Sequence, residues 1–310
     1  FGLLKHTQNR SKRTRSILEK NTSFNCISII NQPKHPLASS SILTYPAVSH
    51  VFMKMEAPMK LEESTWEDVL KLDKNTPVVI PVAAIEQHGR HLPVSVDSML
   101  CGEVIRRVSA ALHGKVLFAP LTWFGNSHHH MDFPGTLSAN PRLYLDLLNN
   151  LADNFIDHGF KRIVFINGHG GNIYPGKQAT FELRQKYRHR SDLLLLFSTY
   201  WDLSPTPQVE LKDFVQKKMG HACEWETSMM MRLAPNLVKG NVKELKKVEF
   251  GFAFEPAYRG WITKDRTEPG HIGDPKHASA EKGEVLFSTF ARDAVAFLEK
   301  VIAWDGKSWF

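Results

Sequence analysis

The feature that most constrains the fold is a regular alternation of short apolar runs with longer amphipathic segments, which begins near Ser64. The apolar runs predict strands, and the longer segments have apolar residues at helical spacing. We predict strands over 77–83, 115–120, 161–167 and 192–199, and helices after Asp97 and over 141–158, 175–189 and 278–301. Strands that alternate with helices of ten or more residues predict an α/β fold, with a mainly parallel sheet covered on both faces.

The N-terminal segment differs from the rest of the chain. Residues 1–54 hold eight Lys or Arg and one acidic residue, Glu19, so their excess of seven positive charges equals the net charge of the whole chain. This segment has no sustained period, and Met53, Met55 and Met59 stand just before the patterned region. We therefore expect residues 1–52 to be a disordered or non-native basic extension, with organelle targeting as the alternative, and residues 53–310 to form the functional domain.

Charge, cysteines and hydropathy narrow the class of protein. Without the first segment the chain is neutral overall, so there is no global electrostatic case for nucleic acid. Cys26, Cys101 and Cys223 form no C-x-x-C pair, and no apolar run reaches the roughly 18–20 residues of a membrane span. We expect a cytoplasmic protein in a reducing compartment that does not bind membranes.

Polar side chains cluster directly after two predicted strands. The first cluster contains Glu86, His88 and Asp97, and the second contains His169 in Gly168-His169-Gly170-Gly171-Asn172. In open α/β sheets, ligands bind at the carboxyl ends of strands. These four side chains are a plausible oxygen and nitrogen ligand set for Zn²⁺, Mn²⁺ or Fe²⁺. Either cluster alone has a simpler explanation, as surface polarity or as a phosphate-cradling glycine turn.

Two further segments add histidines and carboxylates. His221, Glu224 and Glu226 precede an apolar helical stretch, and His128-His129-His130 lie in a loop before Met131-Asp132-Phe133-Pro134-Gly135-Thr136. We expect His128 and His129 to be solvated. Four separated segments thus each place histidines or carboxylates at the end of a predicted strand or helix, and this favours one common site.

Five runs, EQHGRHLPVSVD, HHMDFPGT, NGHGGN, HACEWETS and GDPKHASAEKGE, together resemble the signature blocks of the creatininase family of metal-dependent amidohydrolases. They extend over about residues 60–300. The resemblance implies a three-layer α/β/α fold, a homo-oligomer that is often a hexamer, and two divalent metal ions. It also implies hydrolysis of a non-peptide C–N bond in a small molecule, such as an amide, formamide, lactam or cyclic amidine, by a metal-bound hydroxide.

Carried over by position, Asp97 would bridge the two metals, with Glu86 and His169 on one and His88 on the other. Creatinine-cleaving members supply a further carboxylate at the position of Gly171, which has no side chain. We assign this role to Glu226, with Glu224 as the second choice.

The remaining positions bear on the substrate. Trp201 matches an aromatic residue of the creatinine pocket, and we expect it to line the substrate site with Gly170 and Asn172. However, Gly170 replaces an aromatic that contacts the ligand, and Lys217 and Lys218 replace a Trp-Asp pair. Creatinine is therefore not the expected substrate, and the formamide hydrolases of pyrimidine precursors look closer.

We expect His221 to shuttle the proton, because an imidazole titrates near working pH. His130 would orient the substrate or support the shuttle, and Glu224 would be a third catalytic residue that affects rate or substrate preference. Two alternatives remain open from the sequence. A metal-dependent sugar isomerase or epimerase would use the same ligands with a base such as Glu224. A binding subunit of the same fold would lack competent metals.

Overall fold

The computed structural model describes residues 59–204, 212–249, 254 and 256–309. These residues belong to one compact unit that spans Met53–Phe310. The predicted extension over residues 1–52 lies outside the described residues and stays a prediction. No helix in the described part of the chain is long and apolar enough to cross a membrane.

The centre of the unit is a five-stranded, fully parallel sheet in the order β1-β3-β2-β4-β5. Its strands are β1 Met59–Lys60, β2 Val78–Val82, β3 Leu117–Phe118, β4 Arg162–Asn167 and β5 Leu194–Thr199. The sequence predicted the four longer apolar runs as strands but not β1, which has only two residues. The predicted strand over 115–120 is likewise reduced to two paired residues.

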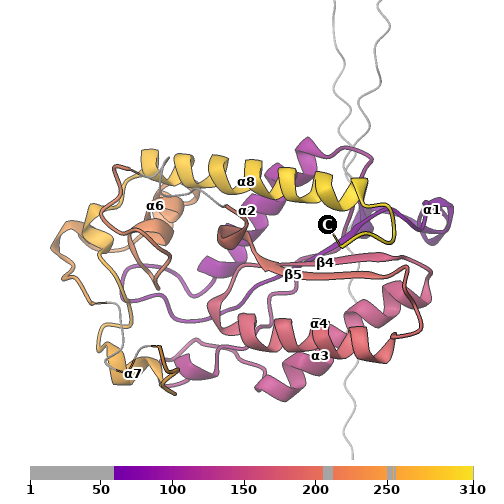
Figure 1. Ribbon diagram of the computed structural model, residues 1–310. Coiled ribbons are helices and arrows are strands. Elements are labelled where there is room, and N and C mark those ends of the chain that lie inside the picture. The colour runs from indigo at the N-terminus through magenta and orange to yellow at the C-terminus, as the bar shows by residue number, and fades with distance from the viewer. Residues whose placement is uncertain (1–58, 205–211, 250–253, 255, 310) are drawn as a thin grey trace, which may run out of the picture. The chain divides into compact units, whose positions relative to one another are not determined.

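Helices cover both faces of the sheet, as Figure 1 shows. The α-helices are α1 Trp66–Lys71, α2 Val96–Ala111, α3 Pro141–Asp157, α4 Ile173–Lys186, α6 Glu224–Leu233, α7 Thr263–Arg266 and α8 Ala280–Ala303. One core lies between the sheet and α2, α6 and α8, and the other lies between the sheet and α3 and α4. The predicted three-layer α/β/α architecture is confirmed.

Strand periodicity explains the two cores. In β4, Val164 and Ile166 enter the core beneath α2 and α8, whereas Ile163 and Phe165 enter the core against α3 and α4. Successive side chains of a strand point to opposite faces, and both faces here are covered. A central strand must therefore be apolar at nearly every position, as the sequence pattern indicated.

The register of the central strands fixes where the site forms. Val82 pairs with Asn167, and Asn167 pairs with Thr199, so β2, β4 and β5 end at the same level. The segments that follow these strands therefore start from one edge of the sheet. One detail differs from the prediction: the helix expected after Asp97 begins one residue before it, at Val96, so Asp97 lies in the first turn of α2.

Candidate active site

Five buried side chains from four segments meet at this edge. Glu86 and His88 follow β2, Asp97 is on α2, His169 follows β4, and Glu226 is in the first turn of α6. Each is at most 5% exposed. Three carboxylates and two imidazoles removed from water carry a large desolvation cost unless they neutralise one another or bind a cation.

Asp97 lies between two histidines. His88 Nε2 is 3.1 Å from Asp97 Oδ1, and His169 Nδ1 is 2.9 Å from Asp97 Oδ2. One carboxylate oxygen thus faces each imidazole. This is the arrangement in which an aspartate can serve two neighbouring cation positions.

The hydrogen bonds of His88 indicate which of its nitrogens is free. His88 Nδ1 lies 3.1 Å from the backbone carbonyl of Glu86, which can only accept, so Nδ1 carries the hydrogen. The Nε2 lone pair then faces Asp97 Oδ1 and, at 3.7 Å, Glu226 Oε1. Burial opposes a charge on this ring, but the Asp97 and Glu226 carboxylates outweigh it and raise the pKa of His88 well above its ordinary value. A proton or a metal ion must stand between these atoms.

His169 follows the same pattern. Its Nε2 lies 3.0 Å from the carbonyl oxygen of Asn126, so this nitrogen carries the hydrogen and Nδ1 faces Asp97. Burial again opposes the charged form, but Glu86 and Asp97 raise the pKa of His169 to about 10. A backbone carbonyl that orients the far nitrogen of an imidazole is the usual outer support of a metal ligand.

The five residues fit a pair of metal ions. They form two groups that share Asp97, one with Glu86 and His169 and the other with His88 and Glu226, and in each group the candidate ligand atoms lie within 4.8 Å of one another. Glu86 Oε2 and Asp97 Oδ2 are buried and lie 3.2 Å and 2.9 Å from the two ring nitrogens of His169. Burial raises the pKa of Glu86, whereas Asp97 has its pKa lowered, because the two histidines outweigh burial there. This donor set suits zinc, manganese or iron.

Gly171 is packed too tightly to hold a side chain. A Cβ at this position would collide with the carbonyl oxygen of Asn126 and with the His169 ring. Glu226, by contrast, reaches the second group from α6, and its Oε2 also lies 3.4 Å from the Cys223 backbone N–H. Helix α6 therefore supplies to the group of His88 and Asp97 the carboxylate that Gly171 lacks.

His221 and His130 adjoin these groups. His221 Nε2 lies 2.8 Å from the Gln87 carbonyl, so it carries the hydrogen, and Nδ1 lies 3.5 Å from Glu86 Oε1. The pKa of His221 is lowered well below its ordinary value, mainly by burial and secondly by the positive charge of His88. The His221 ring is therefore neutral, with its Nδ1 lone pair turned toward the buried carboxylate.

Gln87 is a site residue that the sequence analysis did not single out. Its side-chain amide nitrogen is 2.8 Å from His130 Nδ1 and 2.9 Å from the Gly270 carbonyl, and its Oε1 accepts from Gly89 N. Because His130 Nδ1 then accepts, the other ring nitrogen donates toward Glu86 Oε1 at 3.4 Å. The only available signal was the position of Gln87 between two candidate ligands.

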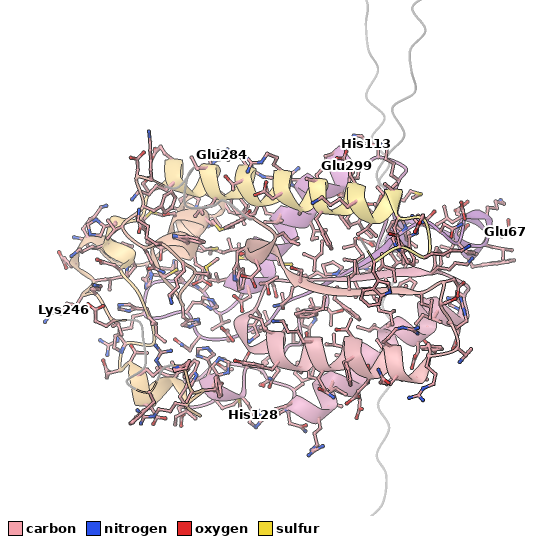
Figure 2. The ribbon with its side chains drawn as sticks, in the orientation of Figure 1. Glu67, His113, His128, Lys246, Glu284 and Glu299 are labelled. Atoms are coloured by element: carbon pink, nitrogen blue, oxygen red, sulfur yellow. The ribbon has the colours of Figure 1, made fainter. Side chains whose placement is uncertain are left out.

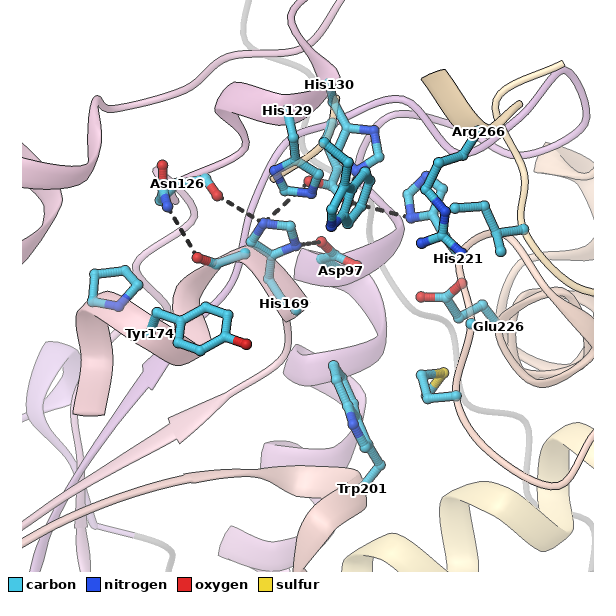
Figure 3. Close-up of a pocket in the computed structure, with 18 of the residues that line it drawn as sticks. Asp97, Asn126, His129, His130, His169, Tyr174, Trp201, His221, Glu226 and Arg266 are labelled. Atoms are coloured by element: carbon cyan, nitrogen blue, oxygen red, sulfur yellow. Dashed lines mark hydrogen bonds and ion pairs between the residues drawn. The ribbon is translucent and has the colours of Figure 1, made fainter. Parts of the chain in front are cut away.

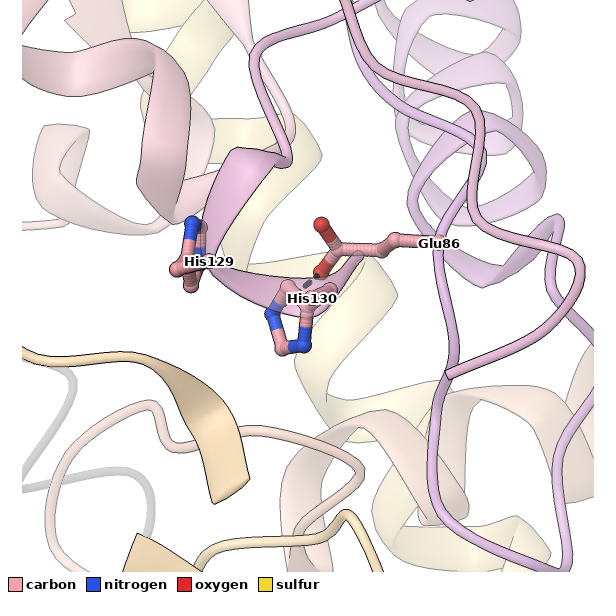
Figure 4. Close-up of side chains that lie close together, drawn as sticks. All are labelled: Glu86, His129 and His130. Atoms are coloured by element: carbon pink, nitrogen blue, oxygen red, sulfur yellow. Dashed lines mark ion pairs between the residues drawn. The ribbon is translucent and has the colours of Figure 1, made fainter. Parts of the chain in front are cut away.

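The prediction for His129 is wrong. His128 is exposed at the margin of the molecule, as expected (Figure 2). His129 instead stacks on His169, with ring centroids 5.9 Å apart, and lines the pocket. Burial is the main cause that lowers the pKa of His129, to about 3. Figure 4 shows His129 and His130 on one short 3₁₀ helix, His128–His130, beside Glu86, a turn that the sequence pattern does not reveal.

Two predicted site residues do not reach the pocket. Glu224 is fully buried and accepts hydrogen bonds from Lys282 Nζ at 2.5 Å and from Gln216 N at 2.7 Å. Asn172 is also fully buried, and its amide bonds to Asn126 N, the Ala83 carbonyl and Asn167. Glu224 therefore anchors the segment before α6, and Asn172 braces the loops around the site.

A cavity of about 590 Å³ opens onto four of the five buried side chains, Glu86, Asp97, His169 and Glu226, whereas His88 lines a second pocket (Figure 3). Trp201 and Gly170 line it, as predicted, and a Cβ at Gly170 would meet nothing within 4 Å. Other residues of the lining were not predicted from the sequence: Tyr174, Tyr258, Trp261 and Arg266. They come from segments outside the recognised blocks, so no local pattern marked them. A cavity of this size suits a small organic molecule.

Comparisons with known proteins agree with this geometry. A family model described as creatininase, creatinine amidohydrolase, matches residues 62–298. The mycofactocin precursor peptide peptidase of Mycolicibacterium smegmatis is 30% identical over 221 residues, which cover 68% of this chain and 79% of the relative. The creatinine amidohydrolase of Pseudomonas putida is 29% identical over 223 residues, covering 67% and 83%. A solved creatininase mutant of the Zn-Zn type has a TM-score of 0.67 at 24% identity, covering 78% and 97%, a likeness of fold.

The chain belongs to the creatininase family. It is an enzyme of the metal-dependent amidohydrolase class, which hydrolyses C–N bonds, and the predicted family is confirmed. Of the alternatives left open by the sequence, this assignment removes the non-catalytic subunit and favours hydrolysis over isomerisation.

Proposed function

We propose that this enzyme hydrolyses the amide or formamide C–N bond of a small molecule with two divalent ions, zinc or manganese before iron. Glu86 and His169 hold one ion, His88 and Glu226 hold the other, and Asp97 bridges them. The observation that carries the proposal is the placement of Asp97, whose two oxygens face imidazole nitrogens at 3.1 and 2.9 Å. The Zn-Zn type of the solved creatininase mutant supports the number of ions.

The chemistry of hydrolysis divides between the ions and the side chains. Two divalent ions, when bound, supply a hydroxide at neutral pH and polarise the amide oxygen. His221 then moves the proton, because its Nδ1 lone pair faces the reacting region while its Nε2 is held by the Gln87 carbonyl. Its neutral state at pH 7 allows it to accept a proton and return it to the leaving nitrogen.

His130 and Gln87 position this shuttle. The His130 and His221 rings stack with centroids 4.3 Å apart, and Gln87 contacts both. Thr263 Oγ1 also lies 2.8 Å from His130 Nδ1, which further restricts the orientation of the ring. We infer that His130 orients substrate or the His221 ring rather than transferring the proton itself.

A small molecule is favoured over a peptide because a cavity of about 590 Å³ suits a small organic molecule. The mycobacterial relative is named for a precursor peptide, so a short peptide terminus is the second candidate substrate. The homo-oligomer and the cytoplasmic location predicted from the sequence stay predictions.

The proposal is tested by metal analysis of purified full-length protein together with a screen for amine release. Formamides, lactams, cyclic ureas and short peptides form the panel. We expect about two ions per chain and turnover of formamides or simple amides. Metal-loaded protein that cleaves only peptides would overturn the substrate class, and one ion per chain at saturation would overturn the two-metal assignment.

A further inference from the structure

The acidic and the cationic residues that line the cavity lie in different parts of it. The acidic residues among the described lining are the three that face the metal positions, Glu86, Asp97 and Glu226. The remaining lining residues with a permanent charge are cationic, Lys218 and Arg266. Two divalent ions together with a hydroxide would balance the three carboxylates, so Lys218 and Arg266 would give the loaded cavity its net positive charge.

The two cations come from separate segments that the fold ties together. Lys218 lies in the segment before α6, and Arg266 is the last residue of α7. His221 and Ile272 exchange backbone hydrogen bonds of 3.0 and 2.7 Å, which joins the two segments. Thr263, in the same helix as Arg266, bonds to His130. Both cations are therefore carried on backbone that is anchored to the catalytic histidines.

Aromatic rings line the same cavity as these cations. The guanidinium carbon of Arg266 lies 4.9 Å from the centre of the Trp261 ring, a stacked position that restricts its direction. The Tyr174 and Tyr258 rings meet edge to face at 5.4 Å, and Trp201 completes the apolar lining. Figure 3 shows Asp97 and His169 between Tyr174 on one side and His221 and Glu226 on the other. The mouth of the cavity is thus suited to a ligand with an apolar or planar part and an anionic end.

We propose that the substrate carries a carboxylate near its scissile amide, and that Arg266 and Lys218 bind this carboxylate while the aromatic rings cover the rest. The proposal rests on the amide hydrolysis proposed above and specifies its substrate class. A guanidinium presents parallel N–H donors that match the two oxygens of a carboxylate, and a nearby lysine adds a point charge. The same positive field disfavours cationic amides and guanidines.

The chain offers a matched control. Lys217 is adjacent to Lys218 and is also exposed, but it does not line the cavity, and its Nζ donates to the Phe214 carbonyl at 2.7 Å. Lys217→Gln removes the same charge one residue away. Any effect that is specific to Lys218→Gln therefore reports on the cavity rather than on the net charge of the protein.

The first arm measures turnover of N-formylphenylalanine and of its neutral carboxamide by metal-loaded enzyme. We expect kcat/KM to be at least about tenfold higher for the acid. Arg266→Gln and Lys218→Gln should each reduce this preference by about tenfold, through KM, with little change for the carboxamide. Lys217→Gln should leave the preference unchanged. Equal kcat/KM for acid and carboxamide in the parent enzyme would overturn the proposal.

The second arm does not depend on turnover and so separates this proposal from the hydrolytic function. Calorimetry compares 3-phenylpropionate with 3-phenylpropanol, neither of which has an amide to cleave. We expect the acid to bind at least about tenfold more tightly, and this advantage to shrink in Arg266→Gln and Lys218→Gln but not in Lys217→Gln. An advantage that persists in both variants would mean that the metals alone bind the carboxylate. A phosphonate analogue that binds more tightly than the carboxylate, with the same dependence on both residues, would reassign the anion to phosphate and overturn the carboxylate.

Discussion

The floor and the mouth of the cavity are built in opposite ways. The floor consists of the lining residues Glu86, Asp97, His169 and Glu226 with His88 directly behind Asp97 and Glu226, and all five are at most 5% exposed and follow strands or begin helices. At the mouth, Tyr174 and Tyr258 are 65% and 67% exposed. A buried floor fixes charged groups in place, whereas an exposed mouth can change its residues at little cost to folding. The difference indicates that the reaction is set by the floor and the choice of substrate by the mouth.

The largest expected effect is at the residue shared by both halves of the floor. Asp97→Asn should abolish turnover and lower metal content from about two ions per chain to near zero, because a bridging carboxylate holds both ions. Atomic absorption and amide hydrolysis measure the two effects on the same sample. Retention of both ions would mean that Asp97 is not a bridge.

His221 should separate catalysis from metal binding. His221→Ala should lower kcat by about 10²–10⁴-fold, the usual contribution of a proton-transfer group, while the metal content stays near that of the parent. Steady-state kinetics and metal analysis test this together. Metal loss as severe as in Asp97→Asn would show that His221 is a ligand.

Two glutamates on α6 give a matched comparison within the floor. Glu226→Gln should remove about one ion per chain and leave the one held by Glu86 and His169. Glu224→Gln should leave both ions in place and lower the free energy of unfolding by about 1–3 kcal/mol, because Lys282 and Gln216 lose a buried carboxylate partner.

Metal titration and chemical unfolding of both variants decide between these roles. Full metal occupancy in Glu226→Gln would restrict Glu226 to capping α6. Loss of an ion in Glu224→Gln would contradict its assignment as an anchor.

Adjacent glycines at the border of floor and mouth should respond differently to the same substitution. Gly171→Ala forces a methyl group against the Asn126 carbonyl and the His169 ring, and should cost about 1–3 kcal/mol of stability together with activity. Gly170→Ala faces open space and should change stability by less than about 0.5 kcal/mol. Thermal unfolding and kcat/KM compare them, and equal losses would show that the loop around His169 relaxes.

The smallest effect is expected on the outer surface of the helical layer, away from both regions. Glu284 lies 2.6 Å from Arg107 and 2.7 Å from Arg232 (Figure 2). Its hydrogen bond to Arg107 is the main cause that lowers the pKa of Glu284, to about 2. A lowered carboxylate pKa stabilises the fold above the ordinary pKa near 4.5, and this contribution is lost as pH falls from there toward 2.

Because Glu284 is 40% exposed, Glu284→Gln should cost only about 0.5–1 kcal/mol at pH 7. Urea unfolding at pH 7 and pH 3 should show the difference between variant and parent shrinking at the lower pH. A constant difference would mean that packing, not charge, accounts for the effect.

Local pattern alone determined the layered fold and most of the floor. The central strands are apolar at nearly every position because both faces of the sheet are covered, and this signal is present in any short window. Glu86, His88, Asp97 and His169 stand directly after such runs or in the block that follows, and parallel strands that end at one level bring them together. The sequence left Glu226 and Glu224 as competing choices, since both are acidic residues in the first turn of the same helix.

Tertiary structure decided what depends on direction and on distant segments. Two residues apart on a helix, Glu226 and Glu224 point in different directions, toward His88 and toward Lys282 respectively. The sequence does not reveal which of the two faces the site, because that depends on the elements packed around the helix. His129 was misassigned because its burial comes from His169 and Trp261, which are far away in the chain. Gln87, Trp261 and Arg266 belong to the site through contacts among loops and the short helix α7, whose positions follow from packing rather than from a repeating pattern. The sequence thus specified the reaction class through its strand ends, and the packed loops specify which molecule can reach it.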